Sequence, residues 1–155
     1  MTKSSRTLIG LFLYFLIVSS AESPACPLEL PTATITINGH SLIVELAATP
    51  AARTCGLSHR EDLPQNRGML FIFPSPGPET FWMKDTLIPL SIAFVDNAGQ
   101  IMSIQDMTPM QTEELYSSQG PARYAIEVNQ GWFEKNGINT GDHVVIELPL
   151  VIDIK

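Results

Sequence analysis

Basic residues are scarce in this sequence. Nine Lys and Arg stand against sixteen Asp and Glu, and the formal net charge is −7. The Lys and Arg residues beyond residue 21 are scattered along the chain, so the sequence lacks the clustered positive charge that binds nucleic-acid or membrane phosphates. We therefore expect no nucleic-acid partner. The acidic balance itself favours solubility.

Motifs of the common catalytic and cofactor sites are also absent. The three histidines form no HExxH pair, and there is no GxSxG elbow, no glycine-rich phosphate loop and no CxxC pair. These absences argue against hydrolases, transferases and dithiol redox enzymes that carry such motifs. We expect no cofactor and no metal centre.

Cysteine is rare, because the chain contains Cys26 and Cys55 and no other. A bond between them would tie the N-terminal segment to the first helix and stabilise the fold by about 3 kcal/mol in the loop-entropy model. The alternative is a buried Cys55 with a free Cys26. The sequence leaves both open.

Long hydrophobic runs are missing except near the N-terminus, at residues 8–18. This run is shorter than the roughly 20 residues that span a bilayer. It follows the basic residues Lys3 and Arg6 and precedes the small residues 19–21. That order is typical of a secretory signal peptide with its cleavage site.

We therefore predict a signal peptide over residues 1–21, with residue 25 as a second cleavage position. A Pro-rich lead-in over residues 22–31 and one mainly-β domain over residues 32–155 follow. Cleavage removes two positive charges and changes the net charge from −7 to −9. The mature protein is then periplasmic or extracellular and has no stable membrane span. An uncleaved anchor, or a lipoprotein acylated at Cys26, is less favoured.

The clearest local signal in the remaining chain is a β-hairpin over residues 34–46. Apolar residues alternate with Thr, Ser and Glu on either side of Asn38-Gly39, a dipeptide typical of two-residue turns because both residues tolerate positive φ. Thr49-Pro50 then begins a short helix, with Thr as N-cap and Pro at the first position. The helix is predicted to end at Gly56.

Short strands at hairpin spacing, with minor helices, favour a single-domain β-sandwich or barrel over a parallel α/β sheet. The predicted fold class is mainly β with one or two short helices. The remaining predicted elements are strands over residues 68–73, 80–84, 90–94, 101–105, 122–128 and 143–148, a rigid loop over 74–78, a loop over 107–121, and a helix capped by Asn129 that ends at Gly137.

The leading candidate site is the cluster of Trp82, Lys84 and Asp85, an aromatic, a cation and an anion in an otherwise apolar region. If Thr80, Trp82 and Lys84 share one strand face, the indole and the ammonium form a surface that stacks on a ring and attracts charge. The alternative is a buried Trp82, with Lys84 at the edge of the core and Asp85 in a turn.

Arg60 and Glu127 are the second pair of candidates. Glu127 interrupts an apolar strand, and a carboxylate in such a strand either faces solvent or needs a partner such as Arg60 or Lys84. A buried structural salt bridge is one interpretation. A catalytic carboxylate with a perturbed pKa is the other.

Three methionines, Met102, Met107 and Met110, suggest a more remote hypothesis. Their thioethers are soft ligands that suit Cu(I) in an exported protein. Methionines scattered over a strand and a loop also serve as packing material.

Several short segments of the chain carry a family resemblance. They are Cys55–Arg60 with Leu63, Gly68–Phe71, Phe81–Thr86, Pro89-Leu90, Tyr124–Glu127 with Gly131, and Gly137-Ile138 with Gly141-Asp142. Their order and spacing closely resemble the family called domain of unknown function 192 over roughly residues 45 to 145. The resemblance implies a jelly-roll-like sandwich or barrel and no established activity. Some relatives carry Cys where this chain has Thr80 and Asp where it has Ser91, so a thiol role or an extra carboxylate is not implied here.

These observations lead us to expect an exported, non-catalytic binding or accessory module of the cell envelope. Its ligand would be a small molecule, a glycan or a segment of an envelope protein, held around Trp82, Lys84 and Asp85. The rival hypothesis is a small envelope enzyme with Glu127 or Asp85 as general base and Lys84 or Arg60 as electrostatic stabiliser. A Cu(I)-binding protein is the remote alternative.

Overall fold

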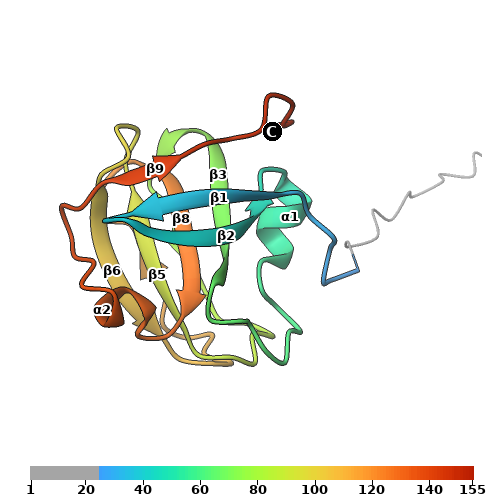
Figure 1. Ribbon diagram of the computed structural model, residues 1–155. Helices are drawn as coiled ribbons and strands as arrows, with labels where there is room; N and C mark the ends of the chain where they lie inside the picture. Colours follow the sequence, from blue (N-terminus) through green and yellow to red (C-terminus); the bar gives the residue numbers. More distant parts are fainter. Residues whose placement is uncertain (1–24) are drawn as a thin grey trace, which may run out of the picture.

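The computed structural model describes residues 25–155, so the predicted signal peptide over residues 1–21 lies outside the described residues. In the described part, nine strands form a seven-stranded sheet, in the order β6-β5-β8-β3-β2-β1-β9, and a two-stranded sheet of β4 and β7 (Figure 1). The strands are β1 (Thr32–Ile37), β2 (His40–Ala47), β3 (Arg67–Gly77), β4 (Thr80–Phe81), β5 (Leu90–Val95), β6 (Ile101–Met107), β7 (Tyr116–Ser117), β8 (Ala122–Asn129) and β9 (Val144–Ile146).

Two short helices, α1 (Pro50–Cys55) and α2 (Trp132–Lys135), accompany the sheets. The large sheet curls into a half-barrel, and all of its strand pairs are antiparallel except β2 with β3, which α1 connects. The predicted mainly-β fold with two short helices is thus confirmed. Neither helix in residues 25–155 has the length or the apolar character needed to cross a bilayer.

The predicted hairpin forms as β1 and β2. Asn38 and Gly39 connect the strands with φ angles of 49° and 81°, the positive values that a tight hairpin turn requires. Ile35 pairs with Leu42 across the two strands, and both side chains are fully buried. The alternation seen in the sequence therefore matches one buried and one more exposed face.

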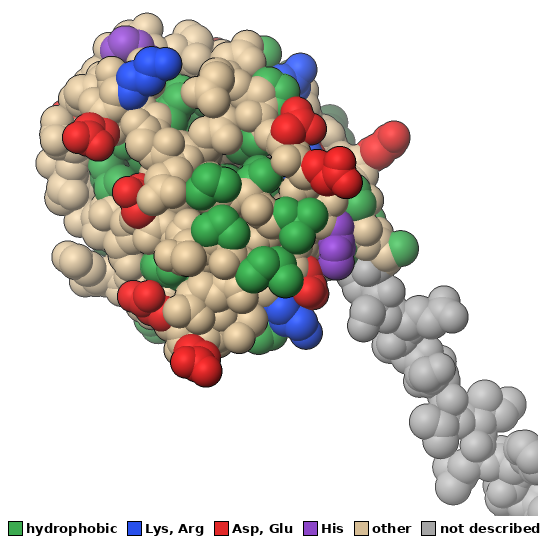
Figure 2. Space-filling model, turned by 90° about the horizontal axis from the view of Figure 1, so that it is seen from below, with side chains coloured by type: hydrophobic (Ala, Val, Ile, Leu, Met, Phe, Trp, Pro, Cys, Tyr) green, Lys and Arg blue, Asp and Glu red, His purple; other side chains and the backbone are tan. Residues whose placement is uncertain are grey.

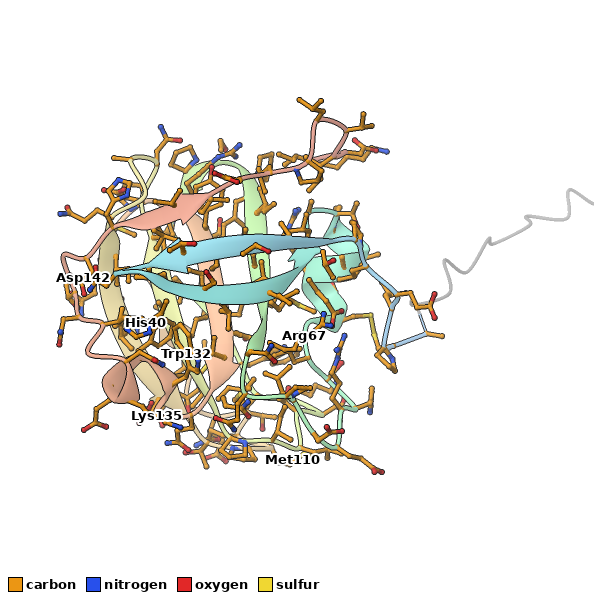
Figure 3. All side chains as sticks on the ribbon, viewed as in Figure 1. His40, Arg67, Met110, Trp132, Lys135 and Asp142 are labelled. Carbon is orange, nitrogen blue, oxygen red and sulfur yellow. A yellow bond between two sulfur atoms is a disulfide. The ribbon has the colours of Figure 1, made fainter. Side chains whose placement is uncertain are left out.

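The curled sheet buries side chains on both of its faces. Along β3, Leu70 and Ile72 belong to one apolar cluster, whereas Met69 and Phe71 belong to a second. The first cluster, the inner core, also receives Trp132 of α2, which is labelled in Figure 3. The second cluster, the outer core, lies between the sheet, α1 and the segment that follows β4. A polar side chain on the outer face of a central strand is consequently buried.

Local signals explain why α1 forms where it does. Thr49 caps the helix, since its hydroxyl oxygen accepts a hydrogen bond of 3.2 Å from the Ala52 N–H, and Pro50 occupies the first turn. Gly56 follows the helix with a φ of 49°. Cys55, in the last turn, forms a disulfide with Cys26 of the lead-in, visible as a yellow bond in Figure 3. The pairing that the sequence left open is therefore present in the structure.

The strand predicted over residues 80–84 ends at Phe81 instead. The Met83 N–H donates to the Gln111 carbonyl at 3.0 Å, and the Thr86 N–H donates back to the Met83 carbonyl at 3.2 Å. Asp85 adopts a positive φ of 56°. These contacts turn the chain after two strand residues, and alternation alone does not encode them.

Two segments predicted as loops contain strands. β3 continues through the proline-rich stretch to Gly77, which pairs with Ala122 after a register shift that follows Ile72. Tyr116 forms β7 by pairing with Phe81, and its hydroxyl accepts a hydrogen bond of 3.0 Å from the Thr108 N–H. Both corrections depend on partners distant in sequence.

The predicted N-cap of the second helix is also wrong. Gly131, with a φ of 79°, stands at the N-cap of α2. The Asn129 amide instead donates to the Leu63 carbonyl at 2.7 Å, which joins the end of β8 to the loop before β3. The side chain that resembled a local cap therefore makes a long-range contact.

Candidate functional site

Trp82 projects from the outer core because its neighbour Phe81 is anchored there. The Phe81 ring makes edge-on contacts with Phe71 and Phe94, with centroid separations of 4.8 and 5.6 Å. Next to this anchor, Trp82 is 53% exposed, and the Lys84 ammonium lies 5.4 Å from the centre of the indole ring. The half-exposed indole therefore presents an aromatic surface with a cation beside it.

Three cavities meet at Trp82, and each of them also touches Thr54 of α1. The floor cavity, of about 40 Å³, is lined by Lys84 and Glu127 among others. The strand-side cavity, of about 410 Å³, includes Glu79 in its lining. The disulfide-side cavity, of about 220 Å³, is lined by Cys26, Ser58, His59, Lys84 and Asp85 in addition to the two shared residues. We call Trp82, Thr54 and the three cavities around them the Trp82 shelf.

Glu127 lies beneath this shelf. It is 5% exposed on β8, and its cross-strand neighbours on the two flanking strands are the fully buried Met69 and Ile92. Burial raises the pKa of the Glu127 carboxyl to about 8, because removal from water disfavours the charged form. Within the described chain, the carboxyl has no ion pair with Arg60 or Lys84.

Arg60 is not on the Trp82 shelf. Its guanidinium donates two hydrogen bonds, of 2.6 and 2.7 Å, to the carboxylate of Glu45 on β2. The pair lines a separate open cavity of about 750 Å³, together with Arg67 and residues of the lead-in; Arg67 is labelled in Figure 3. The structure therefore separates Arg60 from the other candidate residues.

Sequence reasoning missed Arg53, which the last turn of α1 places between the floor and strand-side cavities. Its guanidinium donates to the carbonyls of Ala48 and Ile72 at 2.8 and 3.0 Å and to the main-chain oxygen of Lys155 at 2.6 Å. Desolvation lowers its pKa, and the nearby Glu79 opposes that change. Arg53 therefore ties α1 to β3 and to the C-terminal segment, and its position one helical turn from the cap was the available sequence signal.

Asp85 has a structural contact as well as a place at the shelf. Its carbonyl accepts a hydrogen bond of 2.8 Å from the His59 N–H, which links the segment after α1 to the segment after β4. Its half-buried side chain lines the disulfide-side cavity but not the floor cavity that contains Glu127. The two carboxyl groups proposed as general bases consequently do not share one cavity.

The candidate methionine ligands do not share one exposed surface. Met107 is fully buried in the outer core, whereas Met110 is 54% exposed in a loop. Figure 3 shows Met110 at the lower end of the molecule, and Figure 2 shows hydrophobic side chains gathered among acidic ones on that face. Among residues 25–155, no group of three or more His, Cys, Asp or Glu side chains is arranged to hold a metal ion.

Comparison with known proteins supplies a family. Residues 33–146 match the model of DUF192, described as "Uncharacterized ACR". The chain belongs to the DUF192 family. No functionally curated protein is significantly similar to it.

Two crystal structures resemble this DUF192 chain in fold. One is a candidate transcription regulator from Sinorhizobium meliloti 1021, with a TM-score of 0.73 and 30% identity over 77% of this chain and 97% of that one. The other is a protein of unknown function from Novosphingobium aromaticivorans DSM 12444, with a TM-score of 0.70 and 34% identity over 75% of this chain and 86% of that one. They support the half-barrel fold and assign no activity to this chain.

Ser91 and Thr80, the two positions that the resemblance singled out, both have structural contacts. The Ser91 hydroxyl donates to the Asp106 carboxylate at 2.5 Å and accepts from the Gly131 N–H at 2.9 Å. The Thr80 hydroxyl lies 3.2 Å from that of Ser117, across the small sheet. Ser91 thus joins β5 to β6 and to the start of α2, and neither residue adds a reactive group to the shelf.

Proposed function

We propose that this DUF192 protein is an exported, non-catalytic binding domain whose ligand is held on the Trp82 shelf. The observation that carries the proposal is a half-exposed indole, anchored by its neighbour in the core, with Lys84 5.4 Å from its ring centre and cavities of about 410 and 220 Å³ beside it. A small molecule, a glycan or a segment of an envelope protein would suit such a surface.

Two physical properties of Trp82 favour binding. Covering an ordered aromatic ring gains apolar burial and loses little side-chain entropy, which is why Trp is enriched among residues that dominate binding. The wider cavities are lined by charges of both signs, Arg53 with Glu79 on the strand side and Lys84 with Asp85 on the disulfide side. An uncharged or weakly charged ligand therefore fits better than a strongly charged one.

Export is supported by two independent features. The leader pattern of residues 1–21 favours secretion. The Cys26–Cys55 bond is of a kind that persists in oxidising compartments such as the periplasm.

An enzyme remains the second candidate because Glu127 is a buried carboxyl in a cavity with a pKa raised to about 8. Raised pKa values are typical of general acids and bases. A floor cavity of about 40 Å³, however, has room for one or a few water-sized groups. Asp85 lies in another cavity, so no second carboxyl converges on the same point. The geometry therefore favours binding.

The test is a ligand screen on the purified protein by thermal denaturation, with neutral sugars, peptidoglycan fragments, short peptides, nucleotides and metal salts. A ligand present at about 100 times its dissociation constant should stabilise the fold by about 2.7 kcal/mol, enough to raise Tm by several degrees. Trp82→Ala should abolish the shift and change the unfolding free energy by less than about 1 kcal/mol, because the side chain is half exposed.

Leu87→Ala is the matched control, since Leu87 is 48% exposed and lines none of the three cavities. It should leave the shift unchanged. A ligand that binds Trp82→Ala as well as it binds the wild type would remove the shelf from the proposal.

A further inference from the structure

The floor cavity holds a polar group with no described partner. The Glu127 side chain is more than nine-tenths buried, lines this cavity, and makes neither a hydrogen bond nor an ion pair with residues 25–155. Buried polar groups normally have a partner, and one that lacks it calls for an explanation. Trp82 lines the same cavity and the two wider ones, so the indole adjoins both the cavity of Glu127 and the open part of the shelf.

We propose that the shelf binds a sugar, whose ring stacks on Trp82 while one of its hydroxyl groups enters the floor cavity and forms a hydrogen bond with Glu127. This inference rests on the proposed binding function and specifies its ligand class.

The size of the floor cavity selects a small group. A water molecule needs about 10–15 Å³ of such space, so about 40 Å³ accepts a hydroxyl or a hydroxymethyl group but not a ring. The strand-side cavity, about ten times larger, is where the ring of the sugar would lie. The apolar face of that ring would cover the exposed indole.

The charges around the floor cavity exclude a cationic group. Arg53 of α1 and Lys84 are the titratable side chains that share the cavity lining with Glu127, while Cys55 is held in the disulfide. The flanking strands contribute uncharged neighbours, Met69 and Ile92. An ammonium group on the ligand would be repelled by the two cations and would compete with Lys84 for the indole face.

The protonation state of Glu127 suits a hydroxyl. Its carboxyl is uncharged at neutral pH, since burial raises its pKa to about 8. An uncharged carboxyl donates one hydrogen bond and accepts others, as does a sugar hydroxyl. The Arg53 guanidinium is committed to the fold, since its three hydrogen bonds go to main-chain oxygens.

The experiment is an NMR titration that follows the Trp82 indole N–H, with D-glucose, D-galactose and N-acetyl-D-glucosamine as probes. At least one of these sugars should move the resonance at millimolar concentration. Leu87→Ala should bind it with unchanged affinity. Glu127→Gln keeps a neutral group that donates and accepts, and should bind at pH 6.5 within about threefold of the wild type. Glu127→Leu should bind about tenfold more weakly, because the sugar hydroxyl loses its partner.

Two further measurements distinguish a direct contact between Glu127 and the sugar from an indirect effect of the substitution on the fold. Raising the pH from 6.5 to 9 converts the Glu127 carboxyl from a group that donates and accepts into one that only accepts, so the affinity of the wild type should change with pH over this range and that of Glu127→Gln should not. One monodeoxy analogue of the bound sugar should lose about tenfold in affinity for the wild type but little for Glu127→Leu. Equal pH profiles for the wild type and Glu127→Gln would overturn the role of Glu127. So would equal losses of affinity for every deoxy analogue in the wild type and in Glu127→Leu.

The outcomes also separate the two proposals. If no sugar binds but a peptide or another small molecule does so at Trp82, the sugar inference is wrong and the binding function stands. If no compound of any class binds at Trp82, both are wrong.

Discussion

At the scale of single residues, Glu127 stands out as a carboxyl that is buried on a central strand and has its pKa raised to about 8. A charged carboxylate on the outer face of a central strand would lose its hydration, and no described ion pair compensates for it. The group therefore retains its proton to higher pH, and its pKa rises to about 8 from the ordinary value of 4.5. A raised pKa means that the folded state holds a proton that the unfolded state has released.

Stability should consequently depend on pH through this residue. The contribution of Glu127 is fully present below about pH 4.5, declines between 4.5 and 8, and is lost above 8. At about 1.4 kcal/mol per pKa unit, the total decline is about 5 kcal/mol. Glu127→Gln should abolish this decline. Urea denaturation of both proteins at several pH values between 4.5 and 9 measures it, and parallel curves would show that Glu127 titrates normally.

At the scale of elements, α1 connects the shelf to the rest of the fold. The helix supplies Thr54 and Arg53 to the cavities, Arg53 binds it to β3, and the Cys26–Cys55 bond attaches the lead-in. A helix of six residues has little intrinsic stability in water. Its position therefore depends on the cap at Thr49 and on these tertiary contacts.

Breaking the disulfide should loosen this arrangement. The bond closes a loop with a sequence separation of 29 residues, for which the loop-entropy model gives about 3–4 kcal/mol. We expect Cys26→Ser to lower the unfolding free energy by that amount in chemical denaturation. The Cys26→Ser/Cys55→Ser protein should resemble the single variant. Identical stabilities of the oxidised and the reduced wild type would contradict a stabilising bond.

At the scale of the whole molecule, the distribution of charge and the predicted leader determine where the protein is expected to act. The residues that follow the leader carry a net charge of −9, that is, −7 for the whole chain less the two cations of residues 1–21. Such a surface repels phosphate polymers. The disulfide adds an argument for an oxidising compartment.

Export with cleavage of the predicted leader would give a mature protein with a defined N-terminus and mass. The protein recovered from the periplasm or the medium should begin at Glu22 or Cys26, as measured by intact mass and N-terminal sequencing. A lipid-modified Cys26 would identify a lipoprotein, and an intact leader on membrane-associated protein would identify an anchor. Full-length protein confined to the cytoplasm would contradict export.

Much of the fold could be predicted from local patterns. The β1–β2 hairpin follows from two residues that tolerate positive φ between alternating strands, and α1 follows from Thr49-Pro50 and Gly56. These signals depend on neighbours within a few positions, so the sequence by itself determined them. It also determined the mainly-β fold class and the types of residue at the candidate site.

Only the tertiary structure decided how those residues meet. Phe81 packs against rings from β3 and β5 and thereby turns Trp82 outward. Glu127 lies beneath the shelf because α1 and the segment after β4 cover the outer face of β8. Arg60 lies elsewhere because its guanidinium is paired with Glu45. Burial and pairing of this kind arise from contacts between segments far apart in the chain, and local alternation carries no information about which segments those are.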